Sequence, residues 1–177
     1  MPAAVILAAG ASRRLGRPKQ LVEVDGEPLV HRIARMALTA CEPVAVVAGA
    51  VPLRDALVDL PIALVDNVFW AEGVASSIRA GVAWAEPADS VVLLTCDQVL
   101  LDPAHLRALI RASEEGRLAA SRYDGVLGVP AVFPRAYFPV LLALSGDRGA
   151  QPLLEPAVPV DWPAGARDLD TEADLSD

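Results

Sequence analysis

The chain opens with a short apolar run that leads into the segment Leu7-Ala-Ala-Gly10-Ala-Ser12-Arg13-Arg14-Leu15-Gly16-Arg17-Pro18-Lys19. Four basic residues gather in this segment, although the formal net charge of the chain is -8. Lys19 is the only lysine, and the other 14 of the 15 basic residues are arginine. Positive charge concentrated on an acidic protein is typical of an anion site, and glycine lets backbone N–H groups approach phosphate oxygens. The segment therefore predicts a loop that binds a triphosphate.

The spacing within this loop excludes two common nucleotide-binding motifs. A P-loop carries its lysine directly after the second glycine, whereas Arg17 and Pro18 intervene here. A dinucleotide fingerprint needs three glycines in the order G-x-G-x-x-G, but five residues separate Gly10 from Gly16. The remaining alternatives are a different nucleotide loop and an arginine-rich surface turn with one accidental lysine.

Composition indicates a single domain spanning residues 1–177, with a substantial core. Hydrophobic residues make up 54% of the chain, but no apolar run approaches the ~20 residues that a membrane span needs. Cys41 and Cys96 form no C-x-x-C pair, so we expect a reducing cytoplasmic location. Charges follow the N-terminal apolar run, which argues against a signal peptide. A sequence pI near 4.7 argues against nucleic-acid binding.

Strand-like and helix-like segments alternate along the chain. Strands are predicted at residues 5–8, 44–48, 62–65, 91–95 and 131–133, with an edge run near 118–121, and helices at 29–40, 53–60, 76–85, 104–112 and 136–144. Asp102 is expected to cap the helix that begins near Pro103. Glycine and proline are frequent in residues 124–134 and 155–166, where we expect loops and short strands. The alternation predicts an α/β fold with a mainly parallel sheet, helices on both faces, and a ligand site at the carboxyl ends of the strands.

A carboxylate follows an almost entirely apolar strand in Val91-Val-Leu-Leu-Thr95-Cys96-Asp97-Gln98. A charge at the end of a buried strand needs a cation, and Mg²⁺ commonly binds one or two carboxylates together with substrate phosphates. Helix capping is the alternative, but Asp102 lies nearer to the helix start. We therefore predict that Asp97 binds a metal ion.

Two further blocks of the sequence carry polar residues in informative patterns. Near the C-terminus, Asp168-Leu-Asp170 places two carboxylates on the same side of an extended segment, and the residues from Thr171 onward read as a capped acidic tail. In the middle of the chain, Asp66-Asn67-Val-Phe-Trp70-Ala-Glu-Gly73-Val-Ala-Ser76-Ser77 would start a helix whose free N–H groups can face a nucleotide. Trp70 is expected to pack in the core.

These blocks together resemble the MocA-like branch of the MobA-related molybdenum-cofactor nucleotidyltransferases. The first loop resembles the family pattern Leu-x-x-Gly-x-x-x-Arg-x-Gly-x-x-Lys, and Cys-Asp-Gln resembles the family's Cys-Asp-Gln-Pro with Val99 in place of proline. The middle block resembles Asn-x-x-Trp-Ala-Glu-Gly-x-x-Ser-Ser, and the C-terminal stretch resembles Asp-x-Asp-Thr-Pro-Glu-Asp. The resemblance implies a three-layer α/β/α Rossmann-like fold of the nucleotide-diphospho-sugar transferase type.

The resemblance also implies roles for individual residues. It assigns catalysis to Arg14, Lys19 and Asp97, and Mg²⁺ binding to Asp97 and Asp170, with Asp168 as the alternate second ligand. The residues implied to bind the nucleotide are Leu7, Ala8, Ala9, Gly10, Ser12, Arg13, Gly16, Asn67, Gly73, Ser76 and Ser77. Those implied on the acceptor side are Tyr123, Gly128, Pro130, Asp147 and Arg148. His31 and His105 lie alone in helical patterns and are expected to be structural.

The implied activity is transfer of a nucleotidyl group from an NTP to a phosphorylated acceptor with release of pyrophosphate. The resemblance favours CTP, with GTP as an alternative, and a molybdopterin-type acceptor, with a molybdoenzyme or chaperone as partner. Val126, Leu127 and Val129 stand where molybdopterin-handling members often carry basic residues or histidine, and Gln151 stands where arginine is common. A sugar-phosphate or other small-molecule nucleotidyltransferase therefore stays open, as does a non-catalytic NTP-binding accessory protein.

Overall fold

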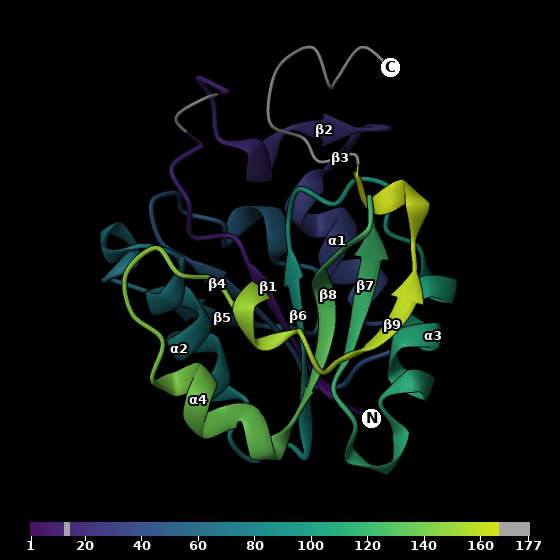
Figure 1. Ribbon diagram of the computed structural model, residues 1–177. Coiled ribbons are helices and arrows are strands. Elements are labelled where there is room, and N and C mark those ends of the chain that lie inside the picture. Colours follow the sequence, from purple (N-terminus) through teal and green to yellow (C-terminus); the bar gives the residue numbers. More distant parts are fainter. Residues whose placement is uncertain (13–14, 167–177) are drawn as a thin grey trace.

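The computed structural model describes residues 1–12 and 15–166, which form a central sheet with helices on both faces (Figure 1). Within these residues, seven strands form one sheet in the order β5-β4-β1-β6-β8-β7-β9. The strands are β1 (Ala3–Leu7), β4 (Val44–Ala48), β5 (Ala63–Asp66), β6 (Ser90–Thr95), β7 (Ala119–Tyr123), β8 (Val126–Pro134) and β9 (Val158–Asp161). Strand β8 is antiparallel to both neighbours, and the other pairings are parallel. The prediction of a mainly parallel sheet is therefore confirmed.

Helices cover the two faces in pairs, as the two hydrophobic cores show. One core joins the sheet to α1 (Leu29–Ala37) and α3 (Pro103–Ala112), and the other joins it to α2 (Val74–Trp84) and α4 (Phe138–Leu142). The sheet thus lies between two helical layers, with α2 and α4 together on one side in Figure 1. This arrangement confirms the predicted three-layer α/β/α architecture.

The central strands are apolar on both faces because each face has its own core to fill. In β1, Ala4 and Ile6 belong to the core under α1 and α3, whereas Ala3 and Val5 belong to the core under α2 and α4. Such two-sided burial is typical of parallel strands covered by helices on both faces. It accounts for the high hydrophobic content without a membrane segment, and no helix in the described part of the chain is long and apolar enough to cross a membrane.

Two predicted helices are much shorter in the structure. Residues 53–60 contain only the 3-10 turn Asp55–Leu57, because Leu53 and Leu57 are the only side chains there that are buried. Residues 136–144 contain the five-residue helix α4, preceded by the 3-10 turn Arg135–Tyr137. In both segments too few apolar side chains face the core to support a longer amphipathic helix.

The segment from 124 to 134, expected to hold loops and only a short strand, forms most of a β-hairpin. Asp124 and Gly125 have φ of 50° and 74° and link β7 to the nine-residue strand β8. Two successive positive φ angles at Asp-Gly are the signature of a type I′ hairpin turn. The Asp124-Gly125 dipeptide was a hairpin signal in the sequence, but the glycines and prolines of the segment led to the expectation of a loop.

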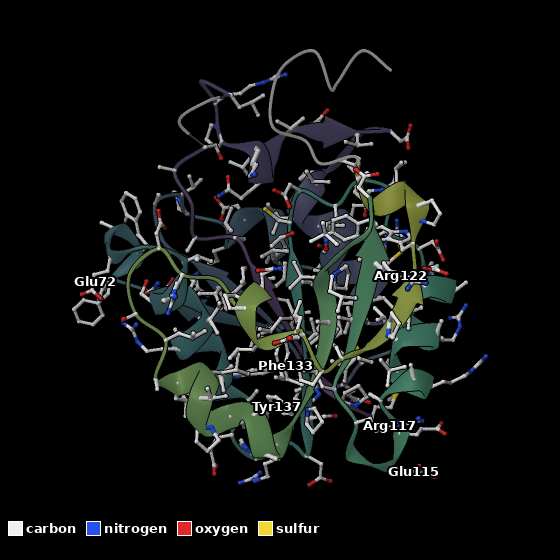
Figure 2. All side chains as sticks on the ribbon, in the orientation of Figure 1. Glu72, Glu115, Arg117, Arg122, Phe133 and Tyr137 are labelled. Atoms are coloured by element: carbon white, nitrogen blue, oxygen red, sulfur yellow. The ribbon has the colours of Figure 1, made fainter. Side chains whose placement is uncertain are left out.

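At the other end of β8, Phe133 contacts Tyr137 with ring centroids 6.1 Å apart (Figure 2).

A charged cluster connects a small hairpin, β2 (Glu23–Val24) with β3 (Glu27–Pro28), to helix α1. The Glu27 carboxylate accepts hydrogen bonds from Nε and Nη2 of Arg35, both at 2.9 Å. His31 lies between Glu27, at 2.6 Å, and Asp59, at 3.1 Å. The hydrogen bonds from Arg35 and His31 lower the pKa of Glu27 to about 2. Burial opposes protonation of His31, but its two carboxylate partners outweigh burial and raise its pKa.

This cluster predicts acid sensitivity. Because the pKa of Glu27 is lowered from 4.5 to about 2, its contribution to stability is present above pH 4.5 and is lost as the pH falls toward 2. We expect Glu27→Gln to lower the free energy of unfolding at pH 7 by about 1 kcal/mol, after allowance for solvent screening, and to flatten its dependence on pH in that window. Urea unfolding at pH 7 and pH 3 measures both effects. Glu155→Gln, an exposed carboxylate outside the cluster, is the control, and an equal pH slope in both variants would contradict the prediction.

Candidate active site

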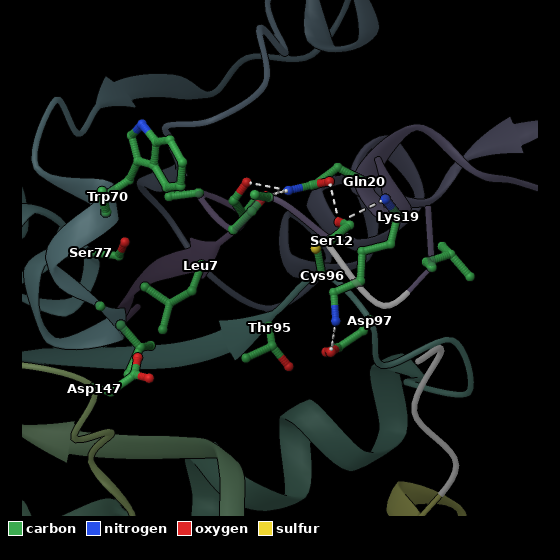
Figure 3. Close-up of a pocket in the computed structure, with 18 residues that line it drawn as sticks. Leu7, Ser12, Lys19, Gln20, Trp70, Ser77, Thr95, Cys96, Asp97 and Asp147 are labelled. Carbon is green, nitrogen blue, oxygen red and sulfur yellow. Dashed lines mark hydrogen bonds and ion pairs between the residues drawn. The ribbon is translucent and has the colours of Figure 1, made fainter. Parts of the chain in front are cut away.

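The loops after β1 and β6 meet at one edge of the sheet. These strands are parallel neighbours, and Leu7 pairs in register with Thr95. A pocket opens where the two strands end, and Figure 3 shows Trp70, Ser77 and Asp147 on one side of it and Lys19 and Asp97 on the other. The residues that line it are Leu7, Ala8, Ala9, Gly10, Ala11, Ser12, Leu15, Lys19, Gln20, Trp70, Ala71, Gly73, Val74, Ser77, Thr95, Cys96, Asp97 and Asp147.

An ion pair joins the two residues that the sequence singled out most strongly. Lys19 Nζ lies 2.6 Å from Asp97 Oδ2, although 78 positions separate the two residues. Their side chains are 22% and 16% exposed, so the pair is partly shielded from water and accessible from the pocket. The structure therefore brings the predicted anion-binding lysine and the predicted metal ligand to the same place.

The second carboxylate oxygen of Asp97 is suited to a metal ion. Asp97 Oδ1 is buried and has no hydrogen-bond partner among the described residues. A buried carboxylate oxygen without a partner is costly, and hard divalent cations prefer oxygen ligands. No group of three or more His, Cys, Asp or Glu side chains within residues 1–12 and 15–166 could hold an ion without further ligands. This chemistry fits Mg²⁺ that takes the rest of its ligands from substrate phosphates and water.

The phosphate-loop prediction involves both described and undescribed residues. Ala8, Ala9, Gly10 and Ser12, which the resemblance assigns to the nucleotide, line the pocket, whereas Gly16 lies outside the lining and has a φ of 73°, which favours glycine. Arg14, which the resemblance assigns to catalysis, and Arg13, which it assigns to the nucleotide, lie outside the described residues. The two metal candidates Asp168 and Asp170 also lie outside them.

Gln20 belongs to the site, and the sequence analysis missed it. Its side chain is 1% exposed, and its Nε2 donates to the carbonyl oxygens of Ala8 at 2.8 Å and Gly10 at 2.7 Å. Ser12 Oγ donates to Gln20 Oε1 at 3.2 Å and accepts a bond from the Lys19 N–H at 3.0 Å. The sequence shows only that a polar amide directly follows the loop lysine. This position does not reveal whether the side chain is buried and bonded to the loop or exposed at the surface.

Asn67 and Ser76, both predicted to bind the nucleotide, do not line the pocket. Asn67 is buried and donates from Nδ2 to Ser76 Oγ at 2.9 Å and to Ser77 Oγ at 3.1 Å. Ser76 Oγ in turn donates to the Gly73 carbonyl at 2.8 Å. These two side chains therefore hold the turn, and Gly73 and Ser77 are the residues that it presents to the pocket.

Trp70 differs from its prediction as a core residue. It packs against the core beneath α2 and α4, but it is only half-buried and also lines the pocket. The residue follows β5 in the 3-10 turn Trp70–Glu72, so it lies at the carboxyl edge of the sheet. An aromatic side chain at that edge serves both as packing and as a wall of the pocket.

The predicted acceptor-side residues divide into two groups. Asp147 lines the pocket, whereas Arg148, Tyr123, Gly128 and Pro130 do not. The Tyr123 ring covers Gly128, where a Cβ would overlap the hydroxyl. The Tyr123 hydroxyl donates to the Val129 carbonyl at 3.1 Å. These contacts tie the tyrosine and its neighbours to strand packing beside the pocket.

Neither histidine lines the pocket, which agrees with the structural role that the sequence suggested for His31 and His105. His105 is buried, stacks on Trp162 with ring centroids 4.8 Å apart, and bonds to Ser121 Oγ at 2.8 Å. Burial raises the pKa of the Cys96 thiol to about 12. The thiol is therefore protonated at neutral pH and is a poor nucleophile, although it lines the pocket.

The fold and the pocket define a class of protein: a three-layer α/β domain whose pocket, lined by a glycine-containing loop with a lysine and by a carboxylate, lies at the carboxyl edge of a mainly parallel sheet. Residues 4–161 match the family model of the MobA-like NTP transferase domain. The chain therefore belongs to the MobA-like NTP transferase family.

Curated relatives cover most of the chain. It is 34% identical to nicotine blue oxidoreductase of Paenarthrobacter nicotinovorans over 92% of this chain and 78% of the relative. It is 32% identical to molybdenum cofactor guanylyltransferase of Pseudomonas entomophila over 88% of this chain and 83% of the relative. A probable molybdenum cofactor guanylyltransferase of Synechococcus elongatus is 34% identical over 64% of this chain and 66% of the relative.

Solved structures show the same fold. The protein Rv0371c of Mycobacterium tuberculosis superposes with a TM-score of 0.81 at 29% identity, over 99% of this chain and 96% of that protein. A structure of the same mycobacterial protein in complex with manganese superposes with a TM-score of 0.75 at 26% identity, over 98% and 95% of the two chains.

Gly73 provides a test of how the pocket wall is built. Its φ of 112° and ψ of 176° lie in a region that is essentially restricted to glycine, and a Cβ would lie 2.6 Å from the Gly146 carbonyl oxygen. We expect Gly73→Ala to lower the free energy of unfolding by about 2–4 kcal/mol, since backbone strain and overpacking add. Urea unfolding measures the loss.

Gly125→Ala is the matched control. Gly125 also has a positive φ, of 74°, but a Cβ there meets nothing within 4 Å. We expect this control to lose about 1 kcal/mol from backbone strain alone. Equal losses in the two variants would show that the contact between Gly73 and the loop around Gly146 is unimportant.

Proposed function

We propose that this protein transfers a nucleotidyl group from an NTP to a phosphorylated acceptor and releases pyrophosphate. One observation carries the proposal: Lys19 and Asp97 meet in a pocket whose opposite wall presents Ser77 and Gly73. A cationic loop and a carboxylate in one cleft are the groups that a metal-bound triphosphate requires. The nucleoside would bind on the Trp70 side of the pocket, which Figure 3 shows opposite the charged pair.

The residues of the chain would act by positioning and by charge stabilisation. Lys19 would contact the β- and γ-phosphates, assisted by Arg14, and N–H groups of the loop from Ala8 to Ser12 would contact phosphate oxygens. An acceptor phosphate oxygen would attack the α-phosphorus in line, and pyrophosphate would leave toward Lys19. The chemistry needs no covalent protein intermediate, which agrees with the protonated Cys96 thiol.

Asp97 would hold the divalent cation, with Asp170, or alternatively Asp168, as the proposed second carboxylate. Mg²⁺ bound there would neutralise charge on the phosphoryl oxygens. Lys19 is bonded to Asp97 here, and the lysine would turn at least one of its three N–H donors to the phosphates when substrate binds. The manganese complex of the mycobacterial protein supports a divalent cation as part of the proposal.

The base and the acceptor are the finer part of the proposal. The sequence favoured CTP, but the relatives with a transferase name are molybdenum cofactor guanylyltransferases, so their names favour GTP and do not support CTP. The same names support a molybdopterin acceptor. Ser77 Oγ already accepts a bond from Asn67, which leaves its own proton for an acceptor atom of the nucleoside. We therefore propose GTP as the first substrate to test and CTP as the second.

A second acceptor class is favoured by the side chains beside the pocket. Val126 is 51% exposed, and Leu127 and Val129 are partly exposed, at the end of β8 that lies at the carboxyl edge of the parallel strands. An apolar edge is poorly suited to a highly anionic pterin. A sugar phosphate or another small phosphorylated molecule is therefore the second candidate acceptor.

The activity can be tested with labelled GTP or CTP, Mg²⁺ and molybdenum-loaded molybdopterin, with sugar phosphates as a second acceptor panel. Release of pyrophosphate that depends on the acceptor is the expected result. Tight NTP binding without pyrophosphate from any acceptor would replace the enzyme proposal with that of an accessory NTP-binding protein.

For Lys19→Ala we expect at least about tenfold lower kcat/KM, because a charge-assisted hydrogen bond contributes about 1.5–3 kcal/mol. Lys19→Arg retains the charge but not the compact ammonium, and we expect it to restore activity only in part. Arg107→Ala, which removes an exposed positive charge from α3, is the control and should have wild-type kinetics. Wild-type kinetics in Lys19→Ala would remove the lysine from the mechanism.

A further inference from the structure

Gln20 is the most deeply buried polar side chain in the wall of the pocket. It is 1% exposed, whereas Lys19 directly before it extends into the pocket and the partly exposed Leu21 follows it. Burial of an amide is costly unless its donors and acceptor are satisfied. Here both donors and one of the two lone pairs are used, because Nε2 donates to two carbonyls and Oε1 accepts from Ser12. Carbonyl oxygens can only accept hydrogen bonds, so the orientation of the amide is fixed by its partners.

Gln20 binds the carbonyls of two alternate residues of the loop, Ala8 and Gly10. The direction of these carbonyls also sets the direction of the N–H group in the same two peptide units. The Ala8 and Gly10 carbonyls both point to Nε2, at 2.8 and 2.7 Å. A trans peptide is planar with its N–H opposite its C=O, so the N–H groups of Ala9 and Ala11 point away from Gln20. Within the described residues, neither N–H donates to any protein acceptor. Both residues line the pocket, so the loop has two donors available to a ligand.

The same glutamine also fixes the far end of the loop. Ser12 has a φ of 51°, which is unusual for a residue other than glycine. Such a conformation persists where surrounding bonds determine it, and Ser12 Oγ is held by Gln20 Oε1 and by the Lys19 N–H. Gln20 therefore connects the strand end at Ala8 to the backbone of the lysine that carries the positive charge. Dashed lines in Figure 3 mark the bonds of Gln20, the bond between Ser12 and the Lys19 backbone, and the bond from the Lys19 side chain to Asp97.

We propose that Gln20 is a positioning residue for polyphosphate binding. Its amide holds the Ala8 and Gly10 carbonyls back from the pocket, so that the N–H groups of Ala9 and Ala11 and the ammonium of Lys19 converge on one polyphosphate anion. Without Gln20 the carbonyls are free to turn toward the anion, where their partial negative charge opposes binding. The inference rests on the proposed function, in which this loop binds the triphosphate of an NTP.

Gln20→Met tests the proposal, because methionine keeps the length of the side chain and removes all three hydrogen bonds. Calorimetric titration with inorganic tripolyphosphate probes the anion site without a base or an acceptor. We expect at least about tenfold weaker binding, since several buried bonds and the aim of two donors are lost together. We also expect the KM for the NTP to rise by a similar factor. A merely structural role would reduce the amount of folded protein and leave both constants unchanged.

Ser121→Ala is the matched control. Ser121 is fully buried, accepts a bond from His105 and donates to the Pro130 carbonyl at 2.7 Å, but it does not line the pocket. We expect it to lose stability in urea while its affinity for tripolyphosphate stays within twofold of wild type. Equal affinity in Gln20→Met and wild type would overturn the positioning role and leave the proposed function intact.

A measurement on the wild-type chain keeps the proposal testable if Gln20→Met does not fold. In a titration of ¹⁵N-labelled protein with tripolyphosphate, the amide signals of Ala9 and Ala11 should shift most strongly within the loop. Unchanged Ala9 and Ala11 signals at saturation would overturn the proposal. Pyrophosphate release by the wild-type enzyme is scored separately, so failure of the transferase activity alone is distinguishable from failure of the positioning role.

Discussion

The ion pair between Lys19 and Asp97 is the constraint on which the rest of the site depends. A positive loop on an acidic protein and a carboxylate at the end of a buried strand each need an opposite charge. At 2.6 Å they supply it to each other in a partly shielded pocket, where the attraction is stronger than on an open surface. The pair holds the loop after β1 over the end of β6. In the proposed function, its opening would make both groups available to a substrate and a metal ion.

The sheet brings the two loops of this ion pair together. Strands β1 and β6 are adjacent and parallel, with Leu7 opposite Thr95, so the loops that follow them begin side by side at the same edge of the sheet. Their apolar side chains fill a core on each face, which makes a slip of the register expensive. Hydrophobic packing on the two faces of the sheet thus positions the side chains that line the pocket.

The walls of the pocket are held by buried side-chain amides. Gln20 satisfies two carbonyls of the first loop, and Asn67 satisfies the hydroxyls of Ser76 and Ser77 at the start of α2. In both places a buried amide organises the backbone while its neighbours line the pocket. The residues that line the pocket are thus distinct from the residues that fix its shape, and a sequence pattern contains both kinds without distinguishing them.

The sequence by itself determined the fold class and the two charged residues at the site. Strand periodicity, the basic segment that ends at Lys19 and the placement of Asp97 after an apolar run are all local features. It also identified the segment from Asn67 to Ser77 as a helix start. Only the tertiary structure decided that Asn67 and Ser76 turn inward, that Trp70 forms a wall, that Gln20 is a clamp, and that Asp124-Gly125 closes a long hairpin. Those outcomes depend on contacts between segments that are distant in the sequence and on the register of the strands. No short stretch of the chain determines the free energy of such contacts.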